Sequence, residues 1–226
     1  MLDLIDIHCR INKTKILNGA NLKLEDGQTI GLIGPNGSGK TTLFNCICGY
    51  VDIYKGSVVY QQQDISELEA YRRARLGIGR VFQNSGIFKE LSLLDNMLLA
   101  TSSNKEKAFE FLKQVNLQDK AQEKAGSLSG GQMRLLEIAR TLSLGSELFL
   151  LDEPTAGVSP KMKKDVAKQI HHLKSLKKSI LIIEHDISFI QEFCDLIAVL
   201  DSGKVMMVDT PDNVKSSEIL KEIYFG

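Results

Sequence analysis

The chain has 226 residues, of which 43% are apolar and 25% charged, and both values are ordinary for a globular domain. Basic and acidic residues number 28 each, so the formal net charge is zero, which argues against nucleic acid as a partner. The sequence shows no secretion-signal pattern and no run of the ~18 apolar residues that span a bilayer, so a membrane path would need another chain. The cysteines at 9, 46, 48 and 194 are expected to be buried thiols in a reducing compartment.

Short apolar runs alternate with helical stretches along most of the chain, a pattern typical of a mainly parallel sheet covered by helices. Alternating polarity predicts antiparallel edge strands between residues 2 and 24. Further strands are expected at 28–33, 147–151, 179–184, 195–200 and 204–208. Helices are expected at 40–48, 133–144 and in the tail, 216–226.

The middle of the chain departs from this alternation. From about Ser92 to Leu144 helical patterns prevail, with apolar residues at helical spacing at Leu93, Met97, Leu98, Phe109, Leu112 and Val115. We therefore expect a single domain, 1–226, in which a helical subdomain at 87–129 interrupts an α/β core formed by 1–86 and 130–226.

A glycine-rich loop connects the strand expected at 28–33 to the following helix, and it matches G-x-x-x-x-G-K-[ST]. Its glycines let backbone N–H groups turn toward phosphate oxygens, and the helix N-terminus adds positive potential. Lys40 can reach the β- and γ-phosphates, and the Thr41 hydroxyl can bind Mg²⁺. The predicted nucleotide-binding residues are Gly34, Pro35, Asn36, Gly37, Ser38, Gly39, Lys40, Thr41 and Thr42.

This loop defines the expected fold class. It is an α/β fold with a P-loop NTPase core and a mainly parallel sheet, together with an N-terminal antiparallel β subdomain and the helical insertion. An isolated glycine-rich turn with a chance lysine is the alternative, and the flanking strand and helix disfavour it.

Two carboxylates follow the apolar run 148–151, at the strand end where ligands of open α/β sheets bind. Asp152 would hold Mg²⁺, directly or through water, and Glu153 would polarise an attacking water as general base. A surface acidic pair is the alternative interpretation, which the phosphate loop in the same chain disfavours.

The sequence Leu-Ser-Gly-Gly-Gln at 128–132 begins a helix, which is expected to extend over 133–144. Ser129 is a good N-cap, and the glycines leave backbone N–H groups open to an anion. The motif therefore predicts a second phosphate-binding helix end, although one nucleotide rarely needs two such ends from one core.

With this motif the sequence resembles the ABC ATPase family, whose signature is LSGGQ. The order also fits: phosphate loop, Gln83, signature, Asp152-Glu153 and His185. The resemblance covers nearly the whole chain and implies that two cassettes meet head to tail around ATP. Each nucleotide would be held by one chain's phosphate loop and by the other chain's Ser129, Gly130, Gly131 and Gln132.

The resemblance also assigns roles to two single residues. Gln83 matches the family's Q-loop glutamine, which completes the Mg²⁺ and water shell and would join Thr41 and Asp152 as a metal residue. His185 matches the switch histidine, which senses the γ-phosphate and would act with Glu153 in catalysis. Taken alone, a loop glutamine is usually solvated and a lone histidine is usually structural.

Two positions depart from the family pattern. Ile11 stands where members usually place an aromatic residue that stacks on adenine, and His8 or Arg10 could substitute for it. Ser159 stands near the usual aspartate of the loop after Glu153.

Four local features resemble the ATPases of branched-chain amino-acid importers: 80–84, 135–140, 156–160 and 222–226. None of them contacts substrate, so they indicate branch membership only. The resemblance implies an ATP-hydrolysing transporter subunit at the cytoplasmic face of the membrane that drives branched-chain or other amino-acid uptake. The implied partners are a second cassette, identical or not, transmembrane permease chains and an extracytoplasmic substrate-binding protein.

Other interpretations stay open. A soluble ABC ATPase acting on DNA, ribosomes or protein complexes is the alternative, although such relatives tend to carry a long coiled coil or two cassettes in one chain. P-loop GTPases and kinases are disfavoured by the signature and by the lack of an N-K-x-D motif.

Two apolar sets also admit two interpretations. Ile87, Phe88, Leu91 and Leu94 would either line a groove for a permease helix or pack inside the insertion. The basic stretch 161–178 carries an apolar stripe at Met162, Val166, Ile170, Leu173 and Leu176. A core-packed helix with a solvated basic face is favoured there over a lipid-binding surface.

Overall fold

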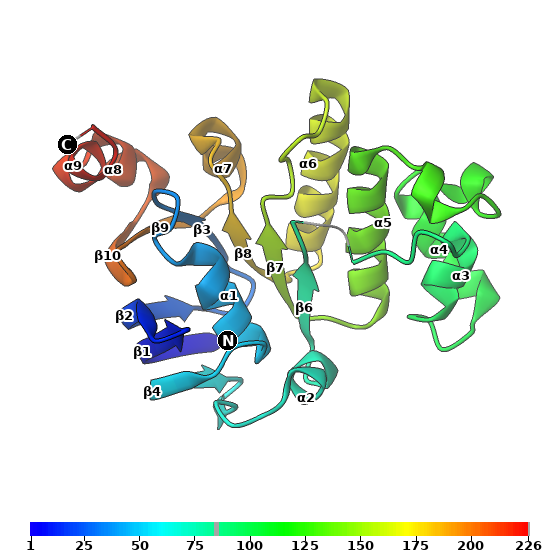
Figure 1. Ribbon diagram of the computed structural model, residues 1–226. Helices are drawn as coiled ribbons and strands as arrows, with labels where there is room; N and C mark the ends of the chain where they lie inside the picture. Colours follow the sequence, from blue (N-terminus) through cyan, green and yellow to red (C-terminus); the bar gives the residue numbers. More distant parts are fainter. Residues whose placement is uncertain (84–85, 226) are drawn as a thin grey trace.

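The computed structural model describes residues 1–83 and 86–225, so Asn84 and Gly226, which end two of the family-like features, lie outside it. The described chain forms two sheets with helices around them (Figure 1). The expected fold, an α/β P-loop core with an N-terminal antiparallel β part and a helical insertion, is confirmed.

The larger sheet has six strands in the order β10-β9-β3-β8-β7-β6, and all neighbours are parallel except β10 and β9. Its strands are β3 (Thr29–Ile33), β6 (Ile78–Val81), β7 (Leu148–Asp152), β8 (Ser179–Ile183), β9 (Leu196–Asp201) and β10 (Lys204–Asp209). Each strand expected here is present, with ends shifted by a residue or two. Because its strands are parallel, the sheet brings the carboxyl ends of β6, β7 and β8 to one edge.

The smaller sheet is antiparallel, in the order β2-β1-β4-β5. Its strands are β1 (Leu2–Ile11), β2 (Thr14–Leu24), β4 (Ile53–Tyr60) and β5 (Gln63–Asp64). The sequence patterns predict β1 and β2 but not β4, whose alternation Gly56 interrupts. Gly56 has φ +100°, and a Cβ there would lie 2.2 Å from the Asp6 carbonyl oxygen, so the strand is irregular at that point.

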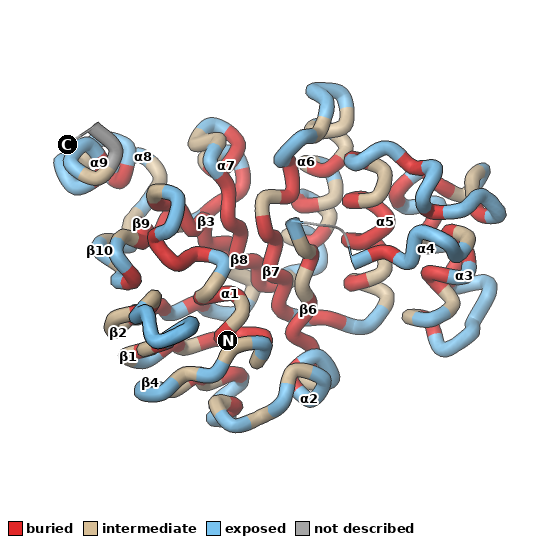
Figure 2. The backbone as a smooth tube through the Cα atoms, viewed as in Figure 1, coloured by how far each residue is buried: buried red, intermediate tan, exposed pale blue. Residues whose placement is uncertain are grey.

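Both faces of the six-stranded sheet are covered, which explains why its central strands read as continuous apolar runs (Figure 2). In β7, Phe149 and Leu151 join the core that includes α5 (Gly130–Ser143), α6 (Pro160–Ser175) and α7 (Ile187–Phe193). Leu148 and Leu150 join the core beneath α1 (Lys40–Cys48) and the smaller sheet.

The helical insertion contains α3 (Leu93–Leu98) and α4 (Lys105–Gln114), which lie beyond α5 from the sheet (Figure 1). Leu93, Met97, Leu112 and Val115 are buried as expected, whereas Phe109 is 37% exposed. Of the four apolar residues after Gln83, two are packed inside the insertion and two are open to a partner. Ile87 and Leu94 are buried, while Phe88 and Leu91 are 55% and 38% exposed.

Helix α5 begins at Gly130, so its predicted start at Met133 is wrong by three residues. The reason is a capping box: Ser129 Oγ accepts the Gln132 N–H, and Gln132 Oε1 accepts the Ser129 N–H. These bonds satisfy N–H groups of the first turn, so the helix can start on two glycines. The expected N-cap role of Ser129 is confirmed.

Farther along α5, a buried ion pair holds the segment after β6. Glu137 Oε1 accepts the N–H groups of Phe82 and Gly86 at 3.1 and 3.0 Å, and Glu137 Oε2 accepts from Arg134 Nη1 at 3.2 Å. Arg134 also donates to the carbonyl oxygens of Phe82 and Gln83. Burial raises the pKa of Glu137 and lowers that of Arg134, and each side chain reduces the shift of the other.

The basic stretch forms α6, and its apolar side packs on the sheet, with Val166, Ile170 and Leu173 fully buried. The preference for a core-packed helix is therefore confirmed. Leu176 does not belong to the stripe, because the helix ends at Ser175 and this side chain is 45% exposed.

The remaining helices are α2 (Ala70–Arg75), α8 (Pro211–Ser216) and α9 (Glu218–Phe225). Helices in residues 1–83 and 86–225 are all too short or too polar to cross a bilayer.

All four cysteines are buried, as expected, and this predicts their reactivity. Burial raises the pKa of Cys48 to about 11 and that of Cys194 to about 12, so thiolate is scarce at pH 8. We expect almost no reaction of the native protein with a disulfide reagent within minutes at pH 8. All four thiols should react after unfolding in guanidinium, and in the native protein the slow reaction of Cys48 should accelerate as the pH rises toward about 11. A fast native thiol would contradict this packing.

Replacing Glu137 by Ala should leave the Arg134 charge buried without its carboxylate partner. Breaking a buried pair in this way costs about 3–5 kcal/mol. Urea unfolding followed by circular dichroism measures the loss. The exposed Glu123, paired with Lys120, provides the control, because Glu123→Ala should change stability by no more than about 0.5 kcal/mol. Equal effects of the two substitutions would argue against the buried pair.

Candidate functional site

The phosphate loop lies between β3 and α1. Gly34 has φ +151°, and a Cβ there would lie 2.0 Å from the Leu200 carbonyl oxygen, so only glycine fits. Within the described residues no side chain caps the N-terminus of α1, and its first turn has no acidic residue. The first N–H groups of α1 are therefore available to an anion.

Lys40 is held inside this loop. Its Nζ donates to the carbonyl oxygens of Gly34 and Pro35 at 2.7 and 2.9 Å. Burial lowers the pKa of Lys40, and the carboxylates of Glu153 and Asp152 oppose that shift. A cavity of about 250 Å³ opens beside it, lined by Ile16, Asn36, Gly37, Gly39, Lys40, Thr41, Thr42 and Glu153. The cavity joins the phosphate loop to Glu153, whereas the predicted binding residue Ser38 is buried.

Asp152 ends β7 and is 1% exposed. Its Oδ2 accepts from Arg80 Nη2 at 2.7 Å, while its buried Oδ1 has no hydrogen-bond partner among the described residues. A buried carboxylate oxygen without a hydrogen-bond partner is well suited to bind a cation. Thr41 and Gln83 offer further oxygen donors, the kind that Mg²⁺ prefers. These residues fit a magnesium ion.

Glu153 follows at φ +47°, a conformation that few residues other than glycine adopt. Its Oε2 accepts from Gln83 Nε2 at 2.7 Å, and its Oε1 lies 3.0 Å from His185 Nε2. The Glu153 side chain is 18% exposed and that of His185 46%. The structure thus brings together Gln83, Glu153 and His185, which follow three neighbouring parallel strands.

Two charged residues at this edge were not predicted as part of the site. Glu184 is buried, and its Oε1 accepts from Thr155 N and Oγ1 at 2.8 and 2.7 Å, while Oε2 accepts from His185 N at 3.3 Å. Arg80 pairs with Asp152. Each of the two lies inside or next to an apolar strand, and a charge in that setting is the sequence signal that could have revealed them.

The two signature glycines differ in their surroundings. A Cβ on Gly131 would lie 2.7 Å from Met162 Cβ, so this glycine lets α5 and α6 approach closely. A Cβ on Gly130 would meet nothing within 4 Å. Gly130 lines a cavity of about 320 Å³ with Gln83, Lys89, Met133, Arg134, Ala156 and Val158. Within the described residues, no signature residue lines the phosphate-loop cavity.

The structure shows the surroundings of the residues at the two departures from the family pattern. His8 Nε2 lies 2.9 Å from Asp6 Oδ1, and Arg10 lies over the Tyr54 ring at 4.3 Å, so both have partners outside the phosphate-loop cavity. Ile11 is 39% exposed. Ser159 caps α6, because its Oγ accepts the Met162 N–H at 3.4 Å.

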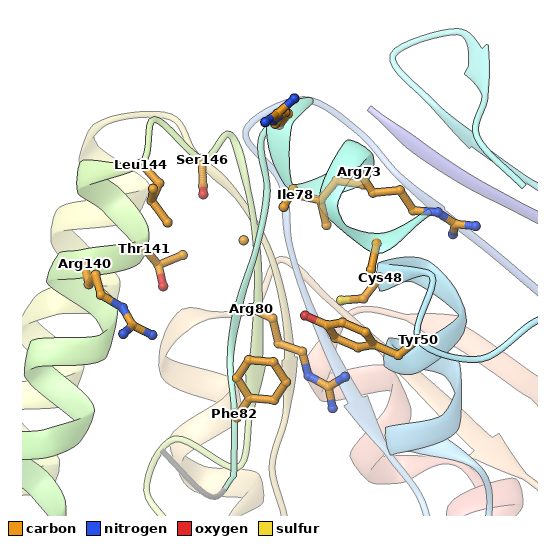
Figure 3. A pocket seen from close by; sticks show the side chains of 14 residues that line it. Cys48, Tyr50, Arg73, Ile78, Arg80, Phe82, Arg140, Thr141, Leu144 and Ser146 are labelled. Carbon is orange, nitrogen blue, oxygen red and sulfur yellow. The ribbon is translucent and has the colours of Figure 1, made fainter. Parts of the chain in front are cut away.

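A larger cavity of about 440 Å³, hereafter the cleft, lies against the edge strand β6 (Figure 3). It is bounded by the end of α1, by α2 and by the C-terminal half of α5. Its charged lining consists of Arg73, Arg75, Arg80 and Arg140, and no acidic residue lines it among the described residues. Tyr50 and Phe82 add aromatic surface.

Comparison with known proteins agrees with these features. The family model described as ABC transporter matches residues 17–156. The branched-chain amino acid transport ATP-binding protein BraF of Pseudomonas aeruginosa is 32% identical, over 100% of this chain and 98% of BraF. The lipopolysaccharide export ATP-binding protein LptB of Haemophilus influenzae is 33% identical, over 94% of this chain and 91% of LptB.

Solved structures give the same result. A nucleotide-free ATP-binding cassette from an ABC transporter aligns with a TM-score of 0.92 at 31% identity, covering 100% of this chain and 99% of that one. The dimeric cassette MJ0796 bound to ADP and Pi aligns with a TM-score of 0.83 at 25% identity, covering 93% and 99%. The chain therefore belongs to the ATP-binding cassette family of ABC transporters.

Proposed function

We propose that this chain hydrolyses ATP and thereby drives a membrane transporter. The observation that carries the proposal is the placement of Glu153 at the phosphate-loop cavity, held by Gln83 at 2.7 Å and by His185 at 3.0 Å. A carboxylate aimed by two side chains beside a phosphate site is suited to activate water.

In this proposal each residue has a defined task. Lys40 and the first N–H groups of α1 bind the β- and γ-phosphates. Thr41, Gln83 and Asp152 hold Mg²⁺, which supplies neutralisation of phosphate charge when bound. Glu153 takes the proton of the attacking water, and His185 holds the Glu153 carboxylate in place. The Glu184 carboxylate accepts the backbone N–H of His185 and so fixes the position of that residue.

Transport requires that ATP favours one conformation of the assembly over another. Two cassettes packed head to tail would provide this difference, because the nucleotide on one phosphate loop would also bind Ser129, Gly130, Gly131 and Gln132 of the partner. Support comes from the open surroundings of Gly130 and from the separation of the signature from the phosphate-loop cavity. The dimeric cassette bound to ADP and Pi is a precedent.

The cleft is the surface on which we place the permease. Arg75 and Arg140 add positive charge that Asp152 does not balance as it balances Arg80, and no acidic side chain lines the cleft among the described residues, so a short permease segment with a carboxylate and apolar side chains would complement it. Phe88 is 55% exposed, and its ring lies 5.8 Å from Arg140, so it extends the aromatic surface at the rim. In this proposal the chain lies at the cytoplasmic face of the membrane.

The cargo we propose is a branched-chain or other amino acid, taken up with the help of an extracytoplasmic binding protein. Similarity to BraF supports this over 100% of the chain. Lipopolysaccharide export is the second candidate, which the comparable similarity to LptB favours.

Glu153→Gln should bind ATP with nearly wild-type affinity and lower the turnover number by about 100-fold or more, the size of a general-base contribution. Phosphate release and binding of a fluorescent ATP analogue measure the two effects. Lys40→Ala is the control, because it should lose binding as well as turnover. Unchanged turnover in Glu153→Gln would remove this residue as the base, and tight binding by Lys40→Ala would refute the phosphate site.

Purification of the tagged chain from gently solubilised membranes of its own organism should recover a multi-span permease in stoichiometric amount. The chain should leave the membrane fraction when Arg75→Glu and Arg140→Glu reverse charge in the cleft. An amino-acid binding protein among the neighbours would favour uptake, and lipopolysaccharide-binding components would favour export. Recovery of soluble partners alone would support a non-transport ATPase.

A further inference from the structure

Arg80 is a charged residue in the edge strand β6, yet its side chain is only 5% exposed. Its guanidinium has two directed bonds. Nη1 donates to Asn45 Oδ1 at 2.5 Å, and Nη2 donates to Asp152 Oδ2 at 2.7 Å. The bonds connect β6 both to α1 and to the end of β7, so they fix the guanidinium plane between three elements.

Aromatic rings hold the same guanidinium from the sides. Arg80 Cζ lies 4.8 Å from the centre of the Phe82 ring, 5.7 Å from that of Phe44 and 6.0 Å from that of Tyr50. Figure 3 shows the side chain between Tyr50 and Phe82 in the wall of the cleft.

The consequence lies at Asp152. Because Arg80 occupies Oδ2, the carboxylate cannot rotate freely, and the partnerless Oδ1 is held in one direction. A ligand oxygen fixed in this way needs no reorganisation when a cation binds, and such supporting contacts commonly contribute 10–100-fold to metal affinity.

We propose that Arg80 is a positioning residue for the cation site, which orients Asp152 Oδ1 toward Mg²⁺ from the wall of the cleft. The inference rests on the proposed role of Asp152. It goes beyond that role, because it makes cation affinity depend on a residue that lines the cleft.

The test measures Mn²⁺ affinity by electron paramagnetic resonance, with the full chain and a non-hydrolysable ATP analogue. Arg80→Lys keeps the positive charge but lacks the planar guanidinium that donates to Asn45 and Asp152 at the same time. We expect about 10-fold weaker Mn²⁺ binding, and analogue binding in EDTA within about 2-fold of wild type. A purely structural role would instead weaken both or leave both unchanged, and either result would overturn the inference.

Arg73→Lys is the matched control. Arg73 is also a buried arginine of the cleft, but it donates to the carbonyl oxygens of Cys46, Leu68 and Ser66 and not to Asp152. Its substitution should leave Mn²⁺ affinity unchanged. An equal loss in both variants would show a general effect of cleft arginines and would overturn the specific role of Arg80.

Two further variants separate the possible failures. Asp152→Asn tests the proposed metal site, because a variant that binds Mn²⁺ as well as wild type would refute that site and not Arg80 alone. If Asp152→Asn weakens Mn²⁺ and Arg80→Lys does not, only the present inference fails. Should Arg80→Lys not fold, Asn45→Ala decides, because it removes the second anchor of the guanidinium and should weaken Mn²⁺ binding in the same direction.

Discussion

Parallel pairing of β6, β7 and β8 is the constraint on which the rest of the site depends. The register places Val81 beside Leu151 and Asp152 beside Ile183, so residues just past each strand meet at one edge. Gln83, Glu153 and His185 come together for this reason, although 70 and 32 residues separate Glu153 from the other two. Parallel strands need long crossovers, and the crossover between β6 and β7 contains the helical insertion and the signature.

Burying this edge requires that its charges find partners. Asp152 pairs with Arg80, Glu137 pairs with Arg134, and Lys40 donates to two loop carbonyls. Each contact satisfies a buried group that would otherwise be costly, and each also fixes a segment next to the proposed nucleotide site. The same bonds therefore provide stability and geometry, and a substitution that removes one of them should affect both.

Local patterns predicted much of this molecule. The sheet strands, the phosphate loop, the Ser129 cap and the core side of α6 follow from spacing and short-range chemistry. Long-range contacts could not be predicted in this way. The partners of Arg80 and Glu184 lie far away in the sequence, and β4 is recognised only through its pairing with β1. The early start of α5 is a different case, because its capping box joins Ser129 to Gln132 only three residues away. Residue type showed that Glu153 and His185 were candidates, but not that they contact each other.

Helix α5 contacts three regions for which we propose functions, along 14 residues or about 21 Å. Its first turn carries the signature, its middle grips the segment of Gln83 through Arg134 and Glu137, and Arg140 and Leu144 near its end line the cleft. A rigid rod with these attachments cannot tilt at one end without displacing the other. In the proposed dimer, a displacement of α5 at the cleft would therefore change the contacts of the nucleotide in its own chain and of the nucleotide in the neighbouring chain at the same time. The two nucleotide sites would respond together.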